Sequence, residues 1–457
     1  MKKLIFSLLF VATAFSALAQ TQLTYFMEGS TFRSRYNPAF APLQGYVNIP
    51  IAGGISANID GNISVSDLLV PTDNGFVTIL DGSVSKDRAM KGLSEMNSLS
   101  TNSTVNIFGI GMFTKNHKSF WSVDINARVE AGLDVPYSFF DFAKNGTAGT
   151  IEDMKLTAEA FMEIGANYSM PILKNLYVGA RVKALLGMAR AQMNIDRMDM
   201  RLQGDIWSAS TAATADIYMN GMSAIVDPMG TIESLDTKFN GIAGYGVAID
   251  LGATYNLLDN LQFSLAVNDI GFISWSKSSA LNMHTDEELV SFDGFDVTVD
   301  ENGTTSEEVD FAFNEMNFYM VSPHSMTRML RATVNAGVEY DVWRHKVGLG
   351  LLYHARFGGY KSSHYLSASV NFHPVRWFTL TPSYTFNNNK AHAVGLALNL
   401  NPGFINLFIA TDMLLTKHTK QWLPYKQERM NVTFGLGVPI GKRSHRIAEY
   451  VKEKDKR

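Results

Sequence analysis

The sequence contains no cysteine, so disulfide bonds cannot hold the fold together. After its first nineteen residues it has no run of about 18 apolar residues, which excludes a membrane-spanning helix from the rest of the chain. Its net charge is only −4, which argues against nucleic acid as a partner. The motifs of serine hydrolases, zinc proteases and phosphate-binding loops are absent, and the ten histidines are scattered. We therefore expect a protein that is not an enzyme and has no cofactor or metal.

The first nineteen residues, MKKLIFSLLFVATAFSALA, have the pattern of a secretory signal. Lys2 and Lys3 precede an apolar stretch, which ends in small residues suited to a cleavage site. Gln20 would then be the first residue of the mature chain. The alternative, a retained membrane anchor, is disfavoured because the apolar stretch is short for a spanning helix.

Alternation of apolar and polar residues with period two, the signal of a half-buried strand, runs through most of the chain. In 377–386, WFTLTPSYTF, large apolar residues share one face while threonine and serine share the other. Such segments occur at 45–60, 104–113, 120–131, 157–169, 175–190, 245–256, 261–274, 329–341, 345–355, 364–372, 377–386, 392–400, 404–413 and 429–440. A strand that crosses a membrane needs about 9–11 residues, and bacterial barrels have even strand numbers. These segments therefore predict an all-β protein, a transmembrane antiparallel up-and-down β-barrel of about 14 strands.

The connections between these segments alternate between short and long, as in outer-membrane barrels with short periplasmic turns and long extracellular loops. The short ones are 114–118, 170–174, 257–260, 342–344, 373–376 and 401–403. Aromatic residues on the apolar face gather near these turns, as an interfacial girdle would: Trp121, Tyr168, Tyr255, Phe263, Tyr340, Phe372 and Phe378. We expect insertion among outer-membrane lipids with both chain termini in the periplasm.

The opposite face of the strands is polar and carries charges of both signs. Alternation places the following side chains toward the lumen: Asp124, Arg128, Glu130, Glu159, Glu163, Arg181, Lys183, Arg331 and Glu339. Cross-strand ion pairs that brace the wall are the first interpretation. A track for a charged ligand is the alternative.

Residues 20–44 precede the first strand and contain SRYNPAFAP, which is too rich in turn formers to pair as a strand. Asn37-Pro38-Ala39 resembles the NPA element near the mature N-terminus of FadL-type fatty-acid channels and of PorV-like barrels of the type IX secretion system. The longer stretch 25–50 resembles an uncharacterised family of exported bacterial barrels. The resemblance implies an N-terminal plug in the lumen.

In such a plug, Asn37, Pro38, Ala39 and Phe40 would form a turn near the barrel wall. Arg33 and Arg35 could pair with inward carboxylates. A tail that packs across the periplasmic mouth, without a gating role, is the alternative.

The predicted organisation is a signal at 1–19, a plug at 20–44, a barrel at 45–440 and a charged periplasmic tail at 441–457. The tail is either solvated or a docking site for a partner. Residues 286–310 hold ten carboxylates and no Lys or Arg. They suit either a solvated hairpin or a calcium site, although their spacing does not match an EF-hand loop.

Two functions from different classes remain open. The first is an outer-membrane channel, FadL-like, for small hydrophobic or amphipathic molecules, with a small apolar ligand. The second is a structural or interaction barrel that does not transport, such as a PorV-like component with a secretion-system or periplasmic protein partner. An apolar pocket in the lumen and a lateral gap in the wall would favour the channel. A sealed lumen and an ordered outer surface would favour the interaction barrel.

Overall fold

The computed structural model describes residues 24–442 apart from 73–74, 116–117, 147, 204–205, 288, 293–316, 344–345, 359–361, 376, 388–391 and 413–428. The predicted signal, most of the acidic segment 286–310 and nearly all of the charged tail lie outside these residues. Among the residues described, no helix is both long enough and apolar enough to cross a membrane.

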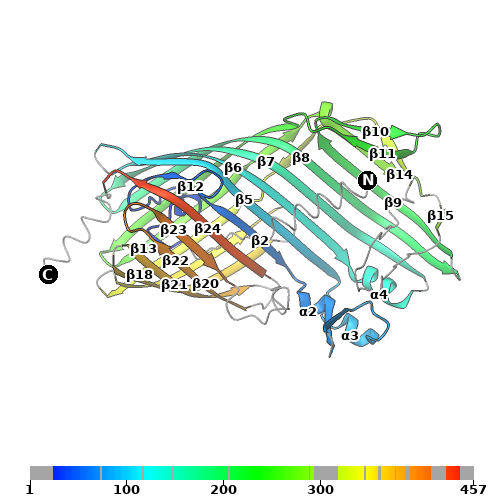
Figure 1. Ribbon diagram of the computed structural model, residues 1–457, viewed down its shortest axis with the longest axis horizontal. Coiled ribbons are helices and arrows are strands. Elements are labelled where there is room, and N and C mark those ends of the chain that lie inside the picture. The colour runs from blue at the N-terminus through cyan, green and yellow to red at the C-terminus, as the bar shows by residue number, and fades with distance from the viewer. Residues whose placement is uncertain are drawn as a thin grey trace.

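A closed antiparallel barrel forms the body of the molecule (Figure 1). In order around the ring, its strands are β1 (Gly45–Asn48) with β2 (Ile55–Gly61), β5 (Met96–Phe113), β6 (Phe120–Pro136), β7 (Ala148–Leu173), β8 (Leu176–Gln203), β12 (Gly244–Leu258), β13 (Leu261–Trp275), β18 (Thr333–Trp343), β19 (Val347–Arg356), β20 (Ser363–Val375), β21 (Phe378–Asn387), β22 (His392–Leu400), β23 (Asn406–Thr411) and β24 (Arg429–Ile440). The last strand pairs with both halves of the first, and this pairing closes the ring. With β1 and β2 taken as one interrupted strand, the ring confirms the predicted barrel of about 14 strands.

The two faces of the wall follow the alternation in the sequence. On β21, Thr381 is fully buried while Tyr384 is 39% exposed. On β6, Ser122 is buried and Val123 is exposed. Large apolar side chains thus cover the outside of the barrel, and small or polar side chains face its interior.

Aromatic side chains mark the two edges of the apolar outer surface. Tyr255 and Tyr340 are exposed near the short turns, and Tyr245 and Phe272 are exposed toward the other end of their strands. Tyr245 and Tyr255 are ten residues apart on β12, which is about 33 Å along a strand. At the usual strand tilt this corresponds to about 25 Å along the barrel axis, the height of the apolar band in membrane barrels.

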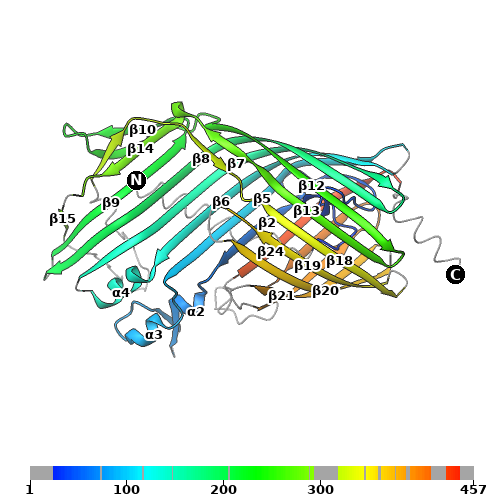
Figure 2. The same ribbon diagram turned by 180° about the vertical axis from the view of Figure 1, so that it is seen from behind.

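One side of the barrel continues far beyond this band, at the end with the long connections (Figures 1 and 2). Tyr245 pairs with Leu186 of β8, yet β8 runs on to Gln203, about 56 Å further along the strand. We call this extension the outer sheet. It comprises the far parts of β7 and β8 with β9 (Ile206–Met219), β14 (Ala280–Thr285), β15 (Leu289–Phe292) and β16 (Phe318–Val321).

A hairpin of β10 (Met222–Val226) and β11 (Ile232–Thr237) packs against the outer sheet. It completes an apolar core in which Ile195, Met198 and Met283 are buried. Alternation does not predict this unit, because 191–244 and 275–328 fall among the long connections between the predicted strands. The remaining elements at this end are α2 (Val65–Leu68), β3 (Leu69–Thr72), β4 (Gly75–Thr78), α3 (Lys86–Met90), α4 (Tyr137–Asn145), η4 (Lys277–Ser279) and β17 (Met326–Met329).

The first strand is interrupted at 49–54, where Ile51 has a positive φ of 66°. Gly53 and Gly54 lie within this interruption. A Cβ on Gly54 would lie 1.8 Å from the ring of Phe32, so glycine is needed where the N-terminal segment packs against the wall.

Candidate functional site

Residues 24–44, here called the N-terminal segment, lie inside the barrel near the short turns (Figures 1 and 2). The segment touches opposite sides of the wall. The hydroxyl of Tyr25 donates a hydrogen bond to Ser264 of β13 at 3.0 Å, whereas Asn406 of β23 donates to the carbonyl of Gly29 at 2.7 Å. Its apolar side chains, including Tyr25 and Tyr36, are buried. Burial raises the pKa of Tyr25, and the hydrogen bond with Ser264 partly offsets this shift.

Asn37-Pro38-Ala39 forms a tight turn against the wall. The side-chain oxygen of Asn37 accepts a hydrogen bond from the backbone N–H of Ala39 at 2.9 Å. The side-chain nitrogen of Asn37 donates to the carbonyls of Ala253 and Leu265, at 3.2 and 3.3 Å. Asn37 is fully buried, and it therefore satisfies the turn and part of the wall at once.

Wall side chains bind the carbonyls of the segment in return. The amides of Asn268 and Asn335 both donate to the carbonyl of Tyr36, at 2.9 and 3.0 Å. The hydroxyl of Ser169 donates to the carbonyl of Ala39 at 2.9 Å. Without the two amides, the buried carbonyl of Tyr36 would lose these hydrogen bonds, which would destabilise the closed state.

Two glycines of the wall make room for the turn. A Cβ on Gly179 would lie 2.1 Å from the carbonyl oxygen of Pro38, and a Cβ on Gly252 would lie 2.1 Å from the side-chain oxygen of Asn37. The turn therefore approaches the wall more closely than any other residue type at these two positions would allow.

Arg33 and Arg35, the two arginines of the segment, have different surroundings. Arg33 donates to the carbonyl of Tyr25 at 3.0 Å, and its guanidinium lies 3.9 Å from the centre of the Phe40 ring. Arg35 reaches the wall, where it donates to Asn126 and lies 3.7 Å from a carboxylate oxygen of Asp124.

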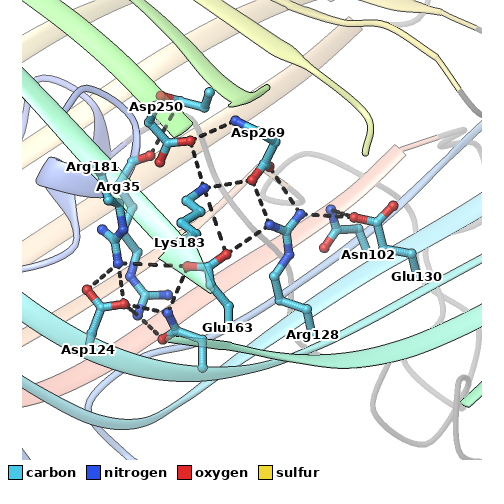
Figure 3. Close-up of polar contacts among 12 residues, drawn as sticks. Arg35, Asn102, Asp124, Arg128, Glu130, Glu163, Arg181, Lys183, Asp250 and Asp269 are labelled. Atoms are coloured by element: carbon cyan, nitrogen blue, oxygen red, sulfur yellow. Dashed lines mark hydrogen bonds and ion pairs between the residues drawn. The ribbon is translucent and has the colours of Figure 1, made fainter. Parts of the chain in front are cut away.

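Arg35 is thereby part of a buried network of charges in the middle of the lumen (Figure 3). The network joins five cations with five carboxylates: Arg35, Arg128, Arg181, Lys183 and Arg356 with Asp124, Glu130, Glu163, Asp250 and Asp269.

The formal charges of the network cancel. Nitrogen–oxygen distances within it include 2.7 Å for Lys183 to Asp269 and 2.8 Å for Lys183 to Asp250. Arg181 and Asp124 are also in direct contact. Because buried charges are tolerated only when they are paired, the strands that carry them are held in one arrangement.

The other predicted lumen residues lie outside this network. Glu159 pairs with Arg190 at 2.7 Å and with Arg328 at 2.8 Å. Arg331 is buried and donates to the carbonyl of Gly358 at 3.1 Å. Glu339 accepts a hydrogen bond from Asn371 at 2.7 Å.

Sequence reasoning missed five charged members of these clusters, and the reason differs between them. Asp250 lies on the inward parity of β12 and could have been found there. Arg356 and Arg328 each lie one residue outside a predicted segment, 345–355 and 329–341 respectively. Arg190 is the last residue of the predicted segment 175–190, and a residue inserted in the pairing after Gly187 shifts its parity. Asp269 was hidden by a bulge: its φ is 61°, and the pairing with β12 skips from Val267 to Ile270.

The bulge at Asp269 turns both Asn268 and Asp269 inward, and both are buried. Strict alternation would have placed Asp269 among the lipids. No signal in the sequence alone identifies this bulge.

A cavity of about 70 Å³ lies between the N-terminal segment, the charged network and the strands β2, β5, β18, β19 and β20. Arg35 and Tyr36 contribute to it from the segment, and Asn58 and Asn102 contribute from the wall. None of its 18 lining residues is aliphatic. In the part of the chain that the structure describes, no group of three acidic or histidine side chains could hold a metal ion.

Several solved barrels are similar to this chain in overall shape. The toluene transporter TodX of Pseudomonas putida matches with a TM-score of 0.38 and 10% identity, over 93% of this chain and 95% of TodX. A FadL homologue of Pseudomonas aeruginosa matches with a TM-score of 0.39 and 10% identity, over 92% and 94% of the two chains.

The translocator domain of the autotransporter NalP of Neisseria meningitidis matches with a TM-score of 0.33 and 7% identity, over 88% and 90%. All these TM-scores are too low to support a conclusion about the function of this chain. No curated protein matches its sequence. A model of a family of unknown function, DUF5723, matches residues 38–412. That match begins within the NPA turn and includes most of the barrel, so the chain belongs to the DUF5723 family.

Proposed function

We propose that this protein is an outer-membrane barrel that does not conduct and that presents its outer sheet to another protein. One observation carries the proposal: the wall extends as an ordered sheet about 56 Å along β8 past the apolar band, while the lumen behind it is filled. A pore would need the opposite arrangement, with an open lumen and loops that leave its mouth free.

The outer surface of the wall supports this location. Two rows of exposed aromatic side chains enclose an apolar band about 25 Å high, which fits a bilayer. The short turns lie at the periplasmic end, since short periplasmic turns are the rule in such barrels. The N-terminal segment then closes the periplasmic half of the lumen, and the outer sheet projects from the cell.

The state of the lumen separates the two candidate functions. The N-terminal segment binds wall strands on opposite sides, and the charged network above it joins β6, β7, β8, β12, β13 and β19 through direct ion pairs. Such a network is costly to open, because each separated pair would leave buried charges without partners. The lumen cavity also lacks the aliphatic lining that a hydrophobic substrate requires.

A channel for small hydrophobic or amphipathic molecules remains the second candidate. It is favoured by the way the N-terminal segment is held, because all its contacts with the wall are noncovalent and the segment could leave the lumen. The segment would then act as a plug, with Asn37, Pro38, Ala39 and Phe40 as its seat on the wall.

Conductance across planar bilayers tests the choice directly. The intact protein should show no stable current steps, whereas a variant without residues 24–40 should conduct if the wall stays closed around an empty lumen. Steady conductance or uptake of a small apolar solute by the intact protein would reject the sealed barrel and support the channel.

The partner is tested separately, in living cells. A photo-activated cross-linking residue at Arg197, whose side chain is 58% exposed on the outer sheet, should yield one discrete protein adduct. The same residue at Leu351, on the lipid-facing surface, serves as the control and should give none. Equal labelling at both positions would contradict a specific partner.

A further inference from the structure

The cavity above the N-terminal segment has a chemical character that the sealed barrel alone does not explain. We propose that it is a binding site for a small, uncharged, polyhydroxylated solute that enters from the side of the outer sheet. Its floor is formed by Arg35 and Tyr36 of the N-terminal segment, and its walls come from strands on both sides of the barrel.

The lining excludes apolar occupants. Tyr36, Tyr365 and His354 are the residues with aromatic rings among the 18 that line the cavity, and no aliphatic residue is among them. An apolar molecule in this space would separate buried polar groups from water without replacing their hydrogen bonds, which is costly for each group left unpaired.

The charges exclude an occupant with a net charge. The five cations and five carboxylates of the network already neutralise one another, and the ion pairs are direct. A charged solute would add one uncompensated charge to a buried, balanced set. Hydroxyl groups, in contrast, can donate and accept hydrogen bonds without changing this balance.

The lining has free hydrogen-bonding groups of both kinds. Among the residues described, Nε of Arg128 and both Nε and Nη1 of Arg181 are buried and donate no hydrogen bond, so an occupant should accept as well as donate. The side-chain oxygens of Asn58, Asn102 and Asn268 are buried and accept no hydrogen bond from the part of the chain that the structure describes, and all three residues line the cavity. Asn58 and Asn102 also lie directly opposite each other on β2 and β5. Acceptors on two directly paired residues suit neighbouring hydroxyl groups of one polyol.

The site also connects the two parts of the lumen. A solute that bound Asn58 and Asn102 on the wall would sit on Arg35 and Tyr36 of the N-terminal segment. Occupancy would therefore stabilise the segment in its seat, because a ligand that binds only the folded, closed state raises its stability.

Ligand-observed NMR on the full-length protein in detergent tests the proposal, with erythritol as the probe. Toluene, acetate and glycine betaine serve as the apolar, anionic and donor-free zwitterionic comparisons. Erythritol should bind and the other three should not. Asn58→Leu should raise the Kd for erythritol by about tenfold, the expected effect of losing one buried hydrogen bond.

Thr381→Val is the matched control, since Thr381 is buried on the inner wall but does not line the cavity. It should leave the Kd unchanged. If Asn58→Leu does not fold, Asn58→Ala removes the same acceptor without added bulk. Absence of erythritol binding to the unmodified protein would overturn the proposal and assign only water to the cavity. Binding of toluene would also overturn it, and would support the hydrophobic channel.

Discussion

The balance of charge in the lumen leads to a sharp prediction about Arg35. It is the one cation of the network that the wall does not supply, and without it the wall carries four cations and five carboxylates. Burial lowers the pKa of the Arg35 guanidinium, while Asp124 opposes that shift. The charge of Asp124 thus favours the charged form of Arg35.

Arg35→Gln removes the ion pair with Asp124 and leaves the network with a charge of −1. Removing one member of a buried pair typically costs about 3–5 kcal/mol. Asp124 keeps its contact with Arg181, so we expect a cost below this range, about 2–3 kcal/mol. This corresponds to a decrease of roughly 30- to 150-fold in the ratio of folded to unfolded protein.

The double variant Arg35→Gln/Asp124→Asn separates charge balance from simple loss of contacts. It leaves four cations and four carboxylates, so the network is again neutral. Asp124→Asn alone should also destabilise the barrel, because Arg35 and Arg181 then share too few carboxylates. We expect the double variant to be more stable than the sum of the two single losses predicts, by about 1–3 kcal/mol.

Urea unfolding in detergent, followed by heat-dependent gel migration, measures all four proteins under the same conditions. Additive losses, with a coupling energy below about 0.5 kcal/mol, would refute the reasoning. Arg35 would then contribute contacts and not charge, and the N-terminal segment would not be electrostatically part of the wall.

Three further predictions concern the lipid face, the seat of the NPA turn and the outer sheet. Leu351→Arg should impair membrane assembly in an extraction assay, at about 2–4 kcal/mol for a cation near mid-bilayer, and Leu351→Ala should not; equal assembly would reject the register of β19. Gly252→Val should displace Asn37 at a cost of about 1–3 kcal/mol and make the N-terminal segment more sensitive to protease. Gly82→Ala, whose added Cβ has nothing within 4 Å, should leave protease cleavage unchanged. Unchanged cleavage of the Gly252→Val variant would contradict the close approach of the turn to the wall. Ile195→Ala, in the core of the outer sheet, should cost about 2–5 kcal/mol locally and speed hydrogen exchange in β9 but not in β13; equal effects on both would show that the sheet and the barrel unfold together.

Alternation was sufficient to predict the barrel, because a wall between lipid and a polar lumen repeats every two residues on each strand. Ser383 and Thr385 of β21 are buried, while Tyr384 between them is exposed, as a period of two residues requires. A membrane wall imposes this pattern over nine or more residues, and soluble strands are usually shorter. The number of strands was therefore accessible from the sequence.

The outer sheet was not accessible, because bulges change the parity of its strands. On β8 the inward set runs through Arg181 and Lys183, but one residue is inserted in the pairing after Gly187 and another after Ile195. Ile195 and Met198 consequently share a buried face although their spacing is odd. Alternation with period two is interrupted at these bulges, so the sequence pattern predicts a loop where the strand continues.

The two arginines of the N-terminal segment show the same limit at the site itself. Because both residues are cations, the sequence predicts that each pairs with a carboxylate. Among the described contacts, only Arg35 forms such an ion pair. They lie two residues apart in η3 (Arg33–Arg35), a 3₁₀ turn, in which each residue rotates by about 120°. The side chains therefore leave the turn in different directions.

One arginine, Arg33, packs on Phe40 within the segment, and the other, Arg35, reaches Asp124 on the wall. This division has a functional consequence. Arg33 helps to fold the segment on itself, so the segment could keep its shape outside the lumen. Arg35 ties that shape to the wall through a charge that the wall lacks. A change that replaced Arg35 as the fifth cation would remove this electrostatic tie without unfolding the segment. A conducting state of the barrel would also require the hydrogen bonds that hold Tyr36 and Asn37 to the wall to break.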